Sequence, residues 1–108
     1  MSACMTFLPK LAGQIISAKK TATIRDVSDS HFFAGQVVDA RVHGTEQYIC
    51  QIEIIDIKPI QYHELNRSHA KAENLPFVFI LKWLIRRIYP GEQQLFYIQF
   101  KVHGDSPY

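Results

Sequence analysis

The sequence predicts an α+β domain that is mainly β, with short flanking helices, and three observations lead to this fold class. Runs rich in Val, Ile and Thr alternate with turn signals over much of the chain, as in half-buried strands. Helical periodicity is confined to short segments between those runs. Leu, Ile, Val and Phe together exceed the roughly 20% of residues below which a chain cannot order itself. At 108 residues we expect a single domain, 1–108, with one compact core.

The N-terminal part of the chain contains one predicted helix and one predicted strand. Residues 6–19 place apolar side chains roughly on one side of a short helix, although a proline and a glycine within it disfavour helix. In residues 21–26, polar and apolar side chains alternate, as they do in a strand with one buried face. Residues 28–35 read as a loop, and we expect the apolar pair Phe32 and Phe33 to hold it against the domain.

Three further strands are predicted. Residues 36–43 and 47–57 are rich in Val and Ile and are joined by a tight turn that contains Gly44, which indicates a hairpin. Residues 94–103 form the last predicted strand. Its inward side carries Phe96, Ile98, Phe100 and Val102.

Two helices are expected between the third and the last of these strands. Residues 62–74 are polar, contain alanine and lack Pro and Gly, which suits a short exposed helix. Pro76 then fits the first turn of a second helix, which ends at Tyr89-Pro90-Gly91. One apolar stripe at helical spacing comprises Phe77, Ile80, Leu81, Leu84, Ile85 and Ile88.

Phe79 and Trp83 lie off that stripe, so the second helix is apolar over more than one face. Two explanations remain open at this point. The helix is either buried more deeply than usual, or it exposes an apolar patch that a second subunit covers. We expect a monomer or a weak homodimer.

The charge is modest overall but unevenly distributed. A formal net charge of +2 argues against a histone-like binder of phosphate backbones. The sharpest positive point is the pair Lys19 and Lys20, with Arg25 close behind and no acid among residues 1–25. Such a cluster either attracts an anionic or polar ligand or is simply a solvated face.

Several classes of protein are excluded by what the chain lacks. No apolar run approaches the ~20 residues of a membrane span, and the N-terminus makes a poor signal peptide. Cys4 and Cys50 do not form a disulfide framework. The five histidines have no zinc-ligand spacing. We therefore predict a cytoplasmic protein with no metal, no cofactor and no membrane association, in which Cys50 is a thiol of the core.

One short segment has the residue types for catalysis. Lys20, Thr23 and Arg25 supply an amine, a hydroxyl and a guanidinium within six residues. A threonine hydroxyl needs an adjacent base to act as a nucleophile, and Lys20 can be that base if the chain bends before Thr21. Glu73 could complete a proton-transfer set. Taken alone, the spacing of Lys20, Thr23 and Arg25 favours a basic loop that leads into a strand, and Glu73 by itself reads as an ordinary surface glutamate.

The blocks KKTATIRDVSDSHF, HAKAEN and IYPGEQQLFYIQFK resemble the small bacterial N4-acetylcytidine amidohydrolases, single-domain members of the ASCH family with a PUA-like β-barrel. The likeness runs from about Phe7 to Lys101. It implies hydrolysis of the acetamide of N4-acetylcytidine to cytidine and acetate. By the same resemblance, Lys20 is the base, Thr23 the nucleophile and Glu73 the proton donor. We assign Arg25 to substrate binding or to the oxyanion.

The resemblance also implies a small-molecule nucleoside as the substrate, with RNA a secondary possibility. The helix after Pro76 is more apolar than in that family, which concerns the oligomeric state and removes no catalytic group. The alternative function is a non-catalytic RNA- or nucleotide-binding PUA-like module. In that case Lys19, Lys20, Arg25 and Phe32 would contact a nucleotide without reacting with it.

Overall fold

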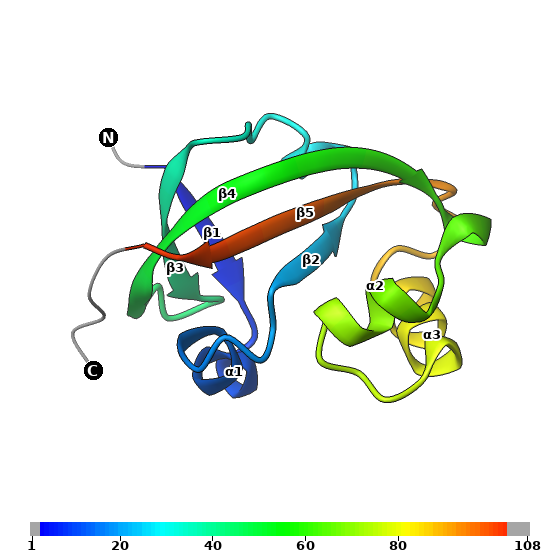
Figure 1. The fold of residues 1–108 in the computed structure, drawn as a ribbon, viewed down its shortest axis with the longest axis horizontal. Coiled ribbons are helices and arrows are strands. Elements are labelled where there is room, and N and C mark those ends of the chain that lie inside the picture. The colour runs from blue at the N-terminus through cyan, green and yellow to red at the C-terminus, as the bar shows by residue number, and fades with distance from the viewer. Residues whose placement is uncertain (1–2, 104–108) are drawn as a thin grey trace.

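Five strands form one curved sheet in the order β1-β3-β4-β5-β2 (Figure 1). The structure is a computed structural model and describes residues 3–103. β1 and β3 are parallel, and the other neighbouring strands are antiparallel. The strands are β1 (Cys4–Phe7), β2 (Ala22–Arg25), β3 (Val37–Val42), β4 (Tyr48–Gln61) and β5 (Gln94–Val102). The mainly β, α+β fold class is confirmed.

The predicted barrel is an open sheet rather than a closed one. β1 and β2 are its two edges, and no backbone ladder joins them. The strong curvature of the long strands β4 and β5 still gives the sheet a barrel-like, PUA-like form (Figure 1). A register shift between Ile54 and Asp56 of β4 adds to this curvature, because a bulge bends and twists its strand.

The helix predicted over 6–19 is wrong in its first part. Residues 4–7 form β1, in which Met5 and Phe7 are buried and the intervening Thr6 is not. A 3₁₀ turn, η1 (Pro9–Leu11), and the short helix α1 (Ala12–Ile16) follow. In so short a strand, the alternation of buried and less buried side chains depends on pairing with β3. The sequence of the segment does not reveal that pairing.

The strand at 21–26, the hairpin and the last strand are confirmed. Gly44 has φ 93° in the turn between β3 and β4. β4 continues to Gln61, four residues beyond the prediction, because it pairs with β5 as far as Gln94. The loop after β2 contains the 3₁₀ turn η2 (Val27–Asp29). Phe32 of that loop is buried as expected, whereas Phe33 is exposed.

The two predicted helices are shorter than expected. The first becomes the 3₁₀ turn η3 (Tyr62–Glu64) and the helix α2 (Arg67–Ala72). The second is α3 (Val78–Ile88), and Pro76 lies before it rather than in its first turn. Phe77 has an extended backbone, with φ −141°, so the helical turn can begin only after it.

The outer face of α3 is exposed, so deeper burial is the wrong explanation for its apolar character. Leu81 and Ile85 of the predicted stripe are buried. Phe79 is 68% exposed and Trp83 is 59% exposed. Phe77, at one end of the stripe, is exposed and stacks on Phe79 with ring centroids 5.4 Å apart. Whether a second subunit covers this patch remains a prediction, which sedimentation analysis would check.

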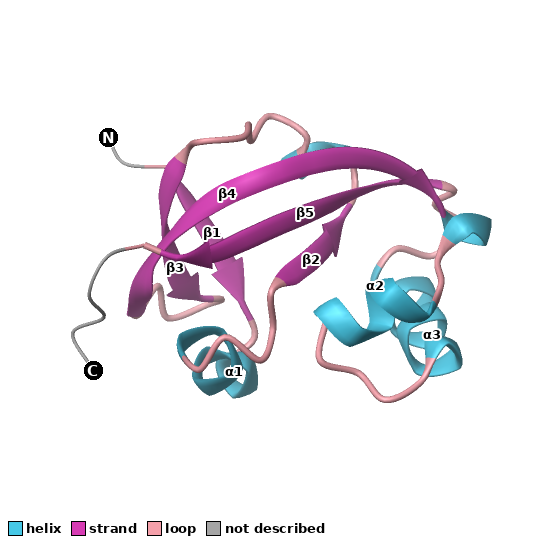
Figure 2. Cartoon of the chain, viewed as in Figure 1, coloured by secondary structure: helices cyan, strands magenta, loops and turns pink. Residues whose placement is uncertain are grey.

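The sheet supports two clusters of buried side chains, not the single core that the chain length predicts. The first cluster lies against β1, β3 and α1, and the second lies against α2 and α3. β4 and β5 are long enough to contribute to both: Ile52 and Ile98 belong to the first cluster, and Ile60 and Leu95 belong to the second. Figure 2 shows the three α-helices on the same side of the arch that these strands form.

Among residues 3–103, no helix is long and apolar enough to cross a membrane. Cys50 is buried in the first cluster, as predicted, and burial raises the pKa of its thiol. Cys4 is a free, exposed cysteine on the edge strand β1.

Candidate active site

A cavity of about 690 Å³ lies between the two clusters of buried side chains. Its walls come from β1, α1, β2, η2, the end of α2 and α3. The structure brings all four predicted site residues to this cavity: Lys20, Thr23, Arg25 and Glu73. Its size is in the range of small-molecule sites, and its lining is apolar with a few convergent polar groups. This is the pattern expected of a site that binds a small organic molecule.

Lys20 reaches the cavity because the chain bends sharply after α1. Ala18 has a left-handed backbone, with φ 63°, and the backbone N–H groups of Lys19 and Lys20 both donate to the carbonyl of Gln14 at 3.0 Å. The bend predicted before Thr21 is thus confirmed. Lys20 is only 3% exposed, so it is not part of a solvated basic loop.

Glu73 is positioned by the C-terminus of α2. Asn74 has φ 59° and donates to the carbonyl of Lys71, while Leu75 donates to that of Ala70. These bonds form a Schellman motif, which favours Gly or Asn at the left-handed position. The last two residues of the HAKAEN block therefore have separate tasks: the asparagine ends the helix, and the glutamate before it faces the cavity.

A backbone hydrogen bond joins this helix end to the loop before β2. The N–H of Thr21 donates to the carbonyl of Ala72 at 2.8 Å. Lys20 and Glu73, the next residue on each side, form an ion pair in which Nζ contacts Oε1. The side chains are 3% and 12% exposed. Two residues 53 positions apart in the sequence thus form one ion pair that is largely shielded from water.

Thr23 is also buried, at 5% exposed, and its hydroxyl is held by Arg25. Nε of Arg25 donates to Thr23 Oγ1 at 3.0 Å. The same guanidinium donates to the carbonyl of Thr6 at 2.7 Å and lies over the ring of Phe7. Arg25 therefore connects β2 to β1, the two open edges of the sheet, while it orients the hydroxyl.

Asp29 is a residue of the site that the sequence analysis missed. Asp26 caps the turn η2, because its side chain accepts from the backbone N–H of Ser28 at 3.1 Å. The turn brings Asp29 back to Arg25, with Nη1 and Oδ2 3.2 Å apart. The sequence did contain one signal for this contact. Arg25 and Asp29 are four residues apart, and the capping residue Asp26 lies between them, a spacing at which a basic and an acidic side chain can form an ion pair.

His69 stabilises the start of the helix that carries Glu73. Its Nδ1 accepts from the backbone N–H of Asn66 at 3.0 Å and completes a capping box with the Asn66 side chain. The imidazole meets the Tyr97 ring edge-on, 4.7 Å between centroids. Burial lowers the pKa of His69 below its ordinary value of 6.5, and Glu64 partly offsets this change.

We expect stability to decrease in acid partly through His69. Since its pKa is lower in the folded chain than in the unfolded chain, the unfolded chain binds the proton first as the pH falls below about 6.5, and stability is lost over that window. Gln at this position accepts the same bond without titrating. Urea unfolding at pH 7.5 and 5.5 should therefore show a smaller loss in His69→Gln than in the parent. An equal loss in both proteins would contradict this role.

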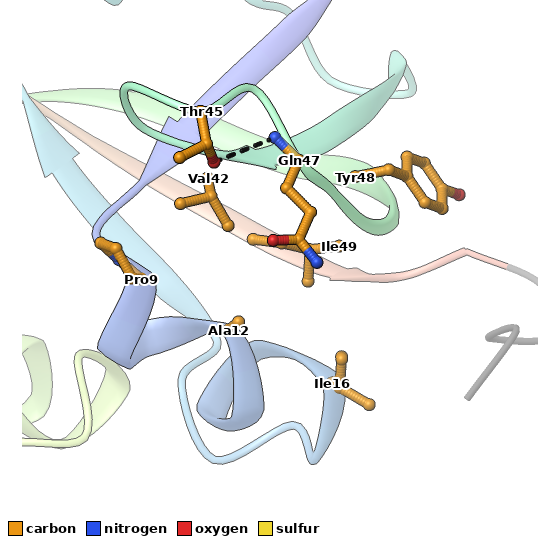
Figure 3. Close-up of a pocket in the computed structure, with 8 residues that line it drawn as sticks. All are labelled: Pro9, Ala12, Ile16, Val42, Thr45, Gln47, Tyr48 and Ile49. Atoms are coloured by element: carbon orange, nitrogen blue, oxygen red, sulfur yellow. Dashed lines mark hydrogen bonds between the residues drawn. The ribbon is translucent and has the colours of Figure 1, made fainter.

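A second cavity, of about 380 Å³, lies between α1 and the β3–β4 turn (Figure 3). Pro9, Ala12 and Ile16 form one side of it, and the turn forms the other, where the N–H of Gln47 donates to Thr45 Oγ1 at 3.3 Å. None of the four predicted site residues lines it. Its lining contains no acid, lysine or histidine, whereas the larger cavity holds the predicted amine, hydroxyl and carboxyl groups together. The larger cavity is therefore the candidate active site.

No three His, Cys, Asp or Glu side chains come close enough to hold a metal ion in the part of the chain described, residues 3–103. The chemistry that the larger cavity offers comes from Lys20, Thr23, Arg25 and Glu73. A hydroxyl, a buried ion pair of an amine with a carboxylate, and a guanidinium that bonds the hydroxyl are groups that an acyl-transfer site can use.

The curved mixed sheet, the helices on one side of it and the cavity between them define a small PUA-like α+β domain. The chain belongs to the ASCH domain family, whose sequence model matches residues 3–76. The ASCH domain of Lactobacillus crispatus JV V101 has a similar fold, with a TM-score of 0.71 and 16% identity over 93% of this chain and 79% of that chain.

Two relatives are similar in sequence over nearly their whole length. A Moritella marina protein named N(4)-acetylcytidine amidohydrolase is 52% identical over 102 residues, 94% of each chain. A Haemophilus influenzae protein of the same name is 40% identical over 93% of this chain and 95% of its own length. The resemblance inferred from the three sequence blocks is therefore confirmed.

Proposed function

We propose that this protein is an amidohydrolase that converts N4-acetylcytidine to cytidine and acetate. One observation supports this most strongly: Lys20 and Thr23 line one cavity with Glu73, which is 53 positions from Lys20 in the sequence, and Lys20 and Glu73 form a buried ion pair. The names of relatives as much as 52% identical over nearly the whole chain point to the same reaction.

The first half of the reaction forms an acetyl-threonine. Transfer of one proton within the pair converts the ammonium and carboxylate into an amine and a carboxylic acid. The amine of Lys20 then takes the proton of Thr23 as its oxygen attacks the acetyl carbonyl. As the C–N bond breaks, Glu73 donates its proton to N4, and cytidine leaves. The pair returns to the ionic form in which it is found, so the step needs no other source of protons.

The second half releases acetic acid, which ionises to acetate in water. Water attacks the acetyl ester, Glu73 accepts the proton of the water, and Lys20 donates its proton to the departing Thr23 oxygen. Both groups end as the neutral pair with which the first half began, and the nucleophile is restored.

Arg25 supports the nucleophile in this scheme. Its Nε donates to Thr23 Oγ1, and a charged donor stabilises negative charge that develops on the oxygen. Three of its five N–H groups are used by Thr23, Asp29 and Thr6. The remaining two are available to the acetyl oxyanion, the role assigned to Arg25 from the sequence.

Arg25→Lys is expected to lower kcat by about 10²-fold, the usual cost of one electrostatic donor. Lysine keeps the charge but cannot span three acceptors with one ammonium. Arg41→Lys is the matched control, because Arg41 likewise bonds a carboxylate and a carbonyl, those of Asp39 and Glu46, but does not line the cavity. Steady-state kinetics on both variants measures the effect, and a full-rate Arg25→Lys enzyme would remove Arg25 from the mechanism.

The direct test of the proposal is to incubate the purified protein with N4-acetylcytidine and follow the products by chromatography. Cytidine and acetate should appear in equal amounts and without added metal or cofactor. A protein that leaves N4-acetylcytidine intact under conditions in which it is folded would overturn the proposal.

RNA binding without catalysis remains the alternative. Lys20 and Phe32, two of the four residues that this function would use, are buried and so present no surface to a nucleotide strand. Lys19 is exposed. A steep log–log decrease of RNA affinity with salt would favour the alternative, because phosphate contacts release counterions.

A further inference from the structure

A second polar cluster lines the larger cavity beyond the reacting groups. It comprises Ser28 and Asp29 of η2 and Tyr89 at the end of α3. Arg25 stands between this cluster and the nucleophile, because Nε donates to Thr23 and Nη1 donates to Asp29. The Asp29 carboxylate and the Thr23 hydroxyl are thus separated by one guanidinium group and two hydrogen bonds. The proposed reaction uses neither Asp29 nor Tyr89.

The end of α3 fixes Tyr89 in this cluster. The N–H of Tyr89 donates to the carbonyl of Ile85 at 2.8 Å as the last bond of the helix. Pro90 cannot continue the helix, and Gly91 takes the left-handed φ of 78° that turns the chain toward β5. The Y-P-G sequence noted at the helix end therefore places Tyr89 in the wall of the cavity.

The phenol of Tyr89 lies among charged groups of the β2–η2 segment. Burial raises the pKa of Tyr89, and the carboxylates of Asp26 and Asp29 add to that change, whereas the Arg25 guanidinium and a hydrogen bond from the backbone of Asp26 oppose it. The backbone N–H of Asp26 holds the phenol oxygen, which leaves the phenol proton to be donated, and within residues 3–103 Arg25 bonds Oδ2 of Asp29 and not Oδ1. The cluster therefore offers one unused donor and one unused charged acceptor to whatever occupies the cavity.

We propose that Asp29 and Tyr89 bind the ribose hydroxyl groups of the substrate, so that the site selects a nucleoside over the free base. This inference rests on the proposed function. Each hydroxyl of ribose both donates and accepts, so neighbouring hydroxyls match a carboxylate beside a phenol. A carboxylate that accepts from a ribose hydroxyl is a common feature of nucleotide-binding sites.

N4-acetylcytidine has its groups in the order that the cavity requires. Its pyrimidine ring separates the acetamide from the ribose, as the guanidinium of Arg25 separates Thr23 from Asp29. α3 lines the same cavity with Leu81, Leu84 and Ile85, and apolar side chains of this kind pack against the flat face of a base. With the acetamide at Thr23, the sugar lies toward Asp29 and Tyr89.

The test compares N4-acetylcytidine with N4-acetylcytosine, which lacks the ribose. The parent enzyme should show the higher kcat/KM on the nucleoside. Tyr89→Phe keeps the ring and removes one hydroxyl, so kcat/KM for the nucleoside should fall about tenfold, the value of one hydrogen bond, mainly through KM. The rate on the free base should change by less than about twofold. Asp29→Asn is expected to lower kcat/KM for both substrates, because Asp29 also bonds Arg25.

Tyr62→Phe is the matched control, because its hydroxyl donates to the carbonyl of Lys82 outside the cavity. This variant should have the parent's kcat/KM for both substrates. The ribose assignment is overturned if the parent enzyme has the same kcat/KM for the free base and for the nucleoside. It is also overturned if Tyr89→Phe lowers kcat/KM equally for both substrates. In either case hydrolysis persists, so the proposed function stands. A parent that cleaves neither substrate overturns the proposed function and this inference together.

Discussion

Thr23→Ala is expected to abolish hydrolysis of N4-acetylcytidine, with a fall in kcat of about 10⁴-fold or more, as for other nucleophile deletions. Alanine cannot form the acetyl ester, and neither Lys20 nor Glu73 can substitute for a missing oxygen. Binding should persist, because the cavity keeps its other polar groups. Product analysis by chromatography and calorimetric titration with the uncleaved substrate measure the two effects separately.

Two variants separate this result from loss of fold. Thr21→Ala is the matched control, since Thr21 is an exposed threonine two residues away that does not line the cavity, and it should be fully active. Thr23→Ser retains the hydroxyl and should retain measurable turnover. If folded Thr23→Ala hydrolyses the substrate at the parent rate, a water molecule or another group is the nucleophile.

Breaking the ion pair of Lys20 with Glu73 is expected to destabilise the fold as well as inactivate the enzyme. Lys20→Met leaves the carboxylate without its partner, and Glu73→Leu leaves a buried ammonium. Each change should lower the free energy of unfolding by about 3 kcal/mol, because an uncompensated charge stays out of water. The double variant removes both charges and should regain most of that loss, although it remains inactive. Urea denaturation of the four proteins measures this cycle.

The pair Lys101 and Glu53 is the control for the cycle. Its atoms are 3.9 Å apart and the lysine is 62% exposed, so Lys101→Met should change stability little. Lys20→Arg adds a test of chemistry, since arginine keeps the charge but does not deprotonate, and we expect it to be inactive. Additive losses in the double variant, or an active Lys20→Arg enzyme, would contradict the coupled role of the pair.

The strands could be predicted from the sequence where alternation and turn residues agree, as in the hairpin around Gly44 and in β5. β1 could not be predicted, because a strand of four residues forms only by pairing with a parallel strand far along the chain. The division of the buried side chains into two clusters could also not be predicted from local sequence patterns. It depends on β4 extending to Gln61, and that extension is determined by pairing with β5.

The three catalytic candidates and Arg25 could be predicted from their residue types and from the family resemblance, and the structure brings them to one cavity. What brings them together was not visible in the sequence. It includes the Thr21–Ala72 hydrogen bond and the left-handed residues Ala18 and Asn74. Asp29 was missed because its position depends on a turn after the strand, and its four-residue spacing from Arg25 indicates an ion pair only once that turn is known.

The measurement that tests the central claim most directly is a crystal structure of Thr23→Ala with N4-acetylcytidine bound. Our account predicts that the acetyl carbonyl carbon lies beside the methyl group of the substituted residue, with N4 directed at Glu73 and the space left by the hydroxyl within reach of Lys20. A nucleoside bound in the smaller cavity beside α1, or one whose acetamide points away from Lys20 and Glu73, would contradict it.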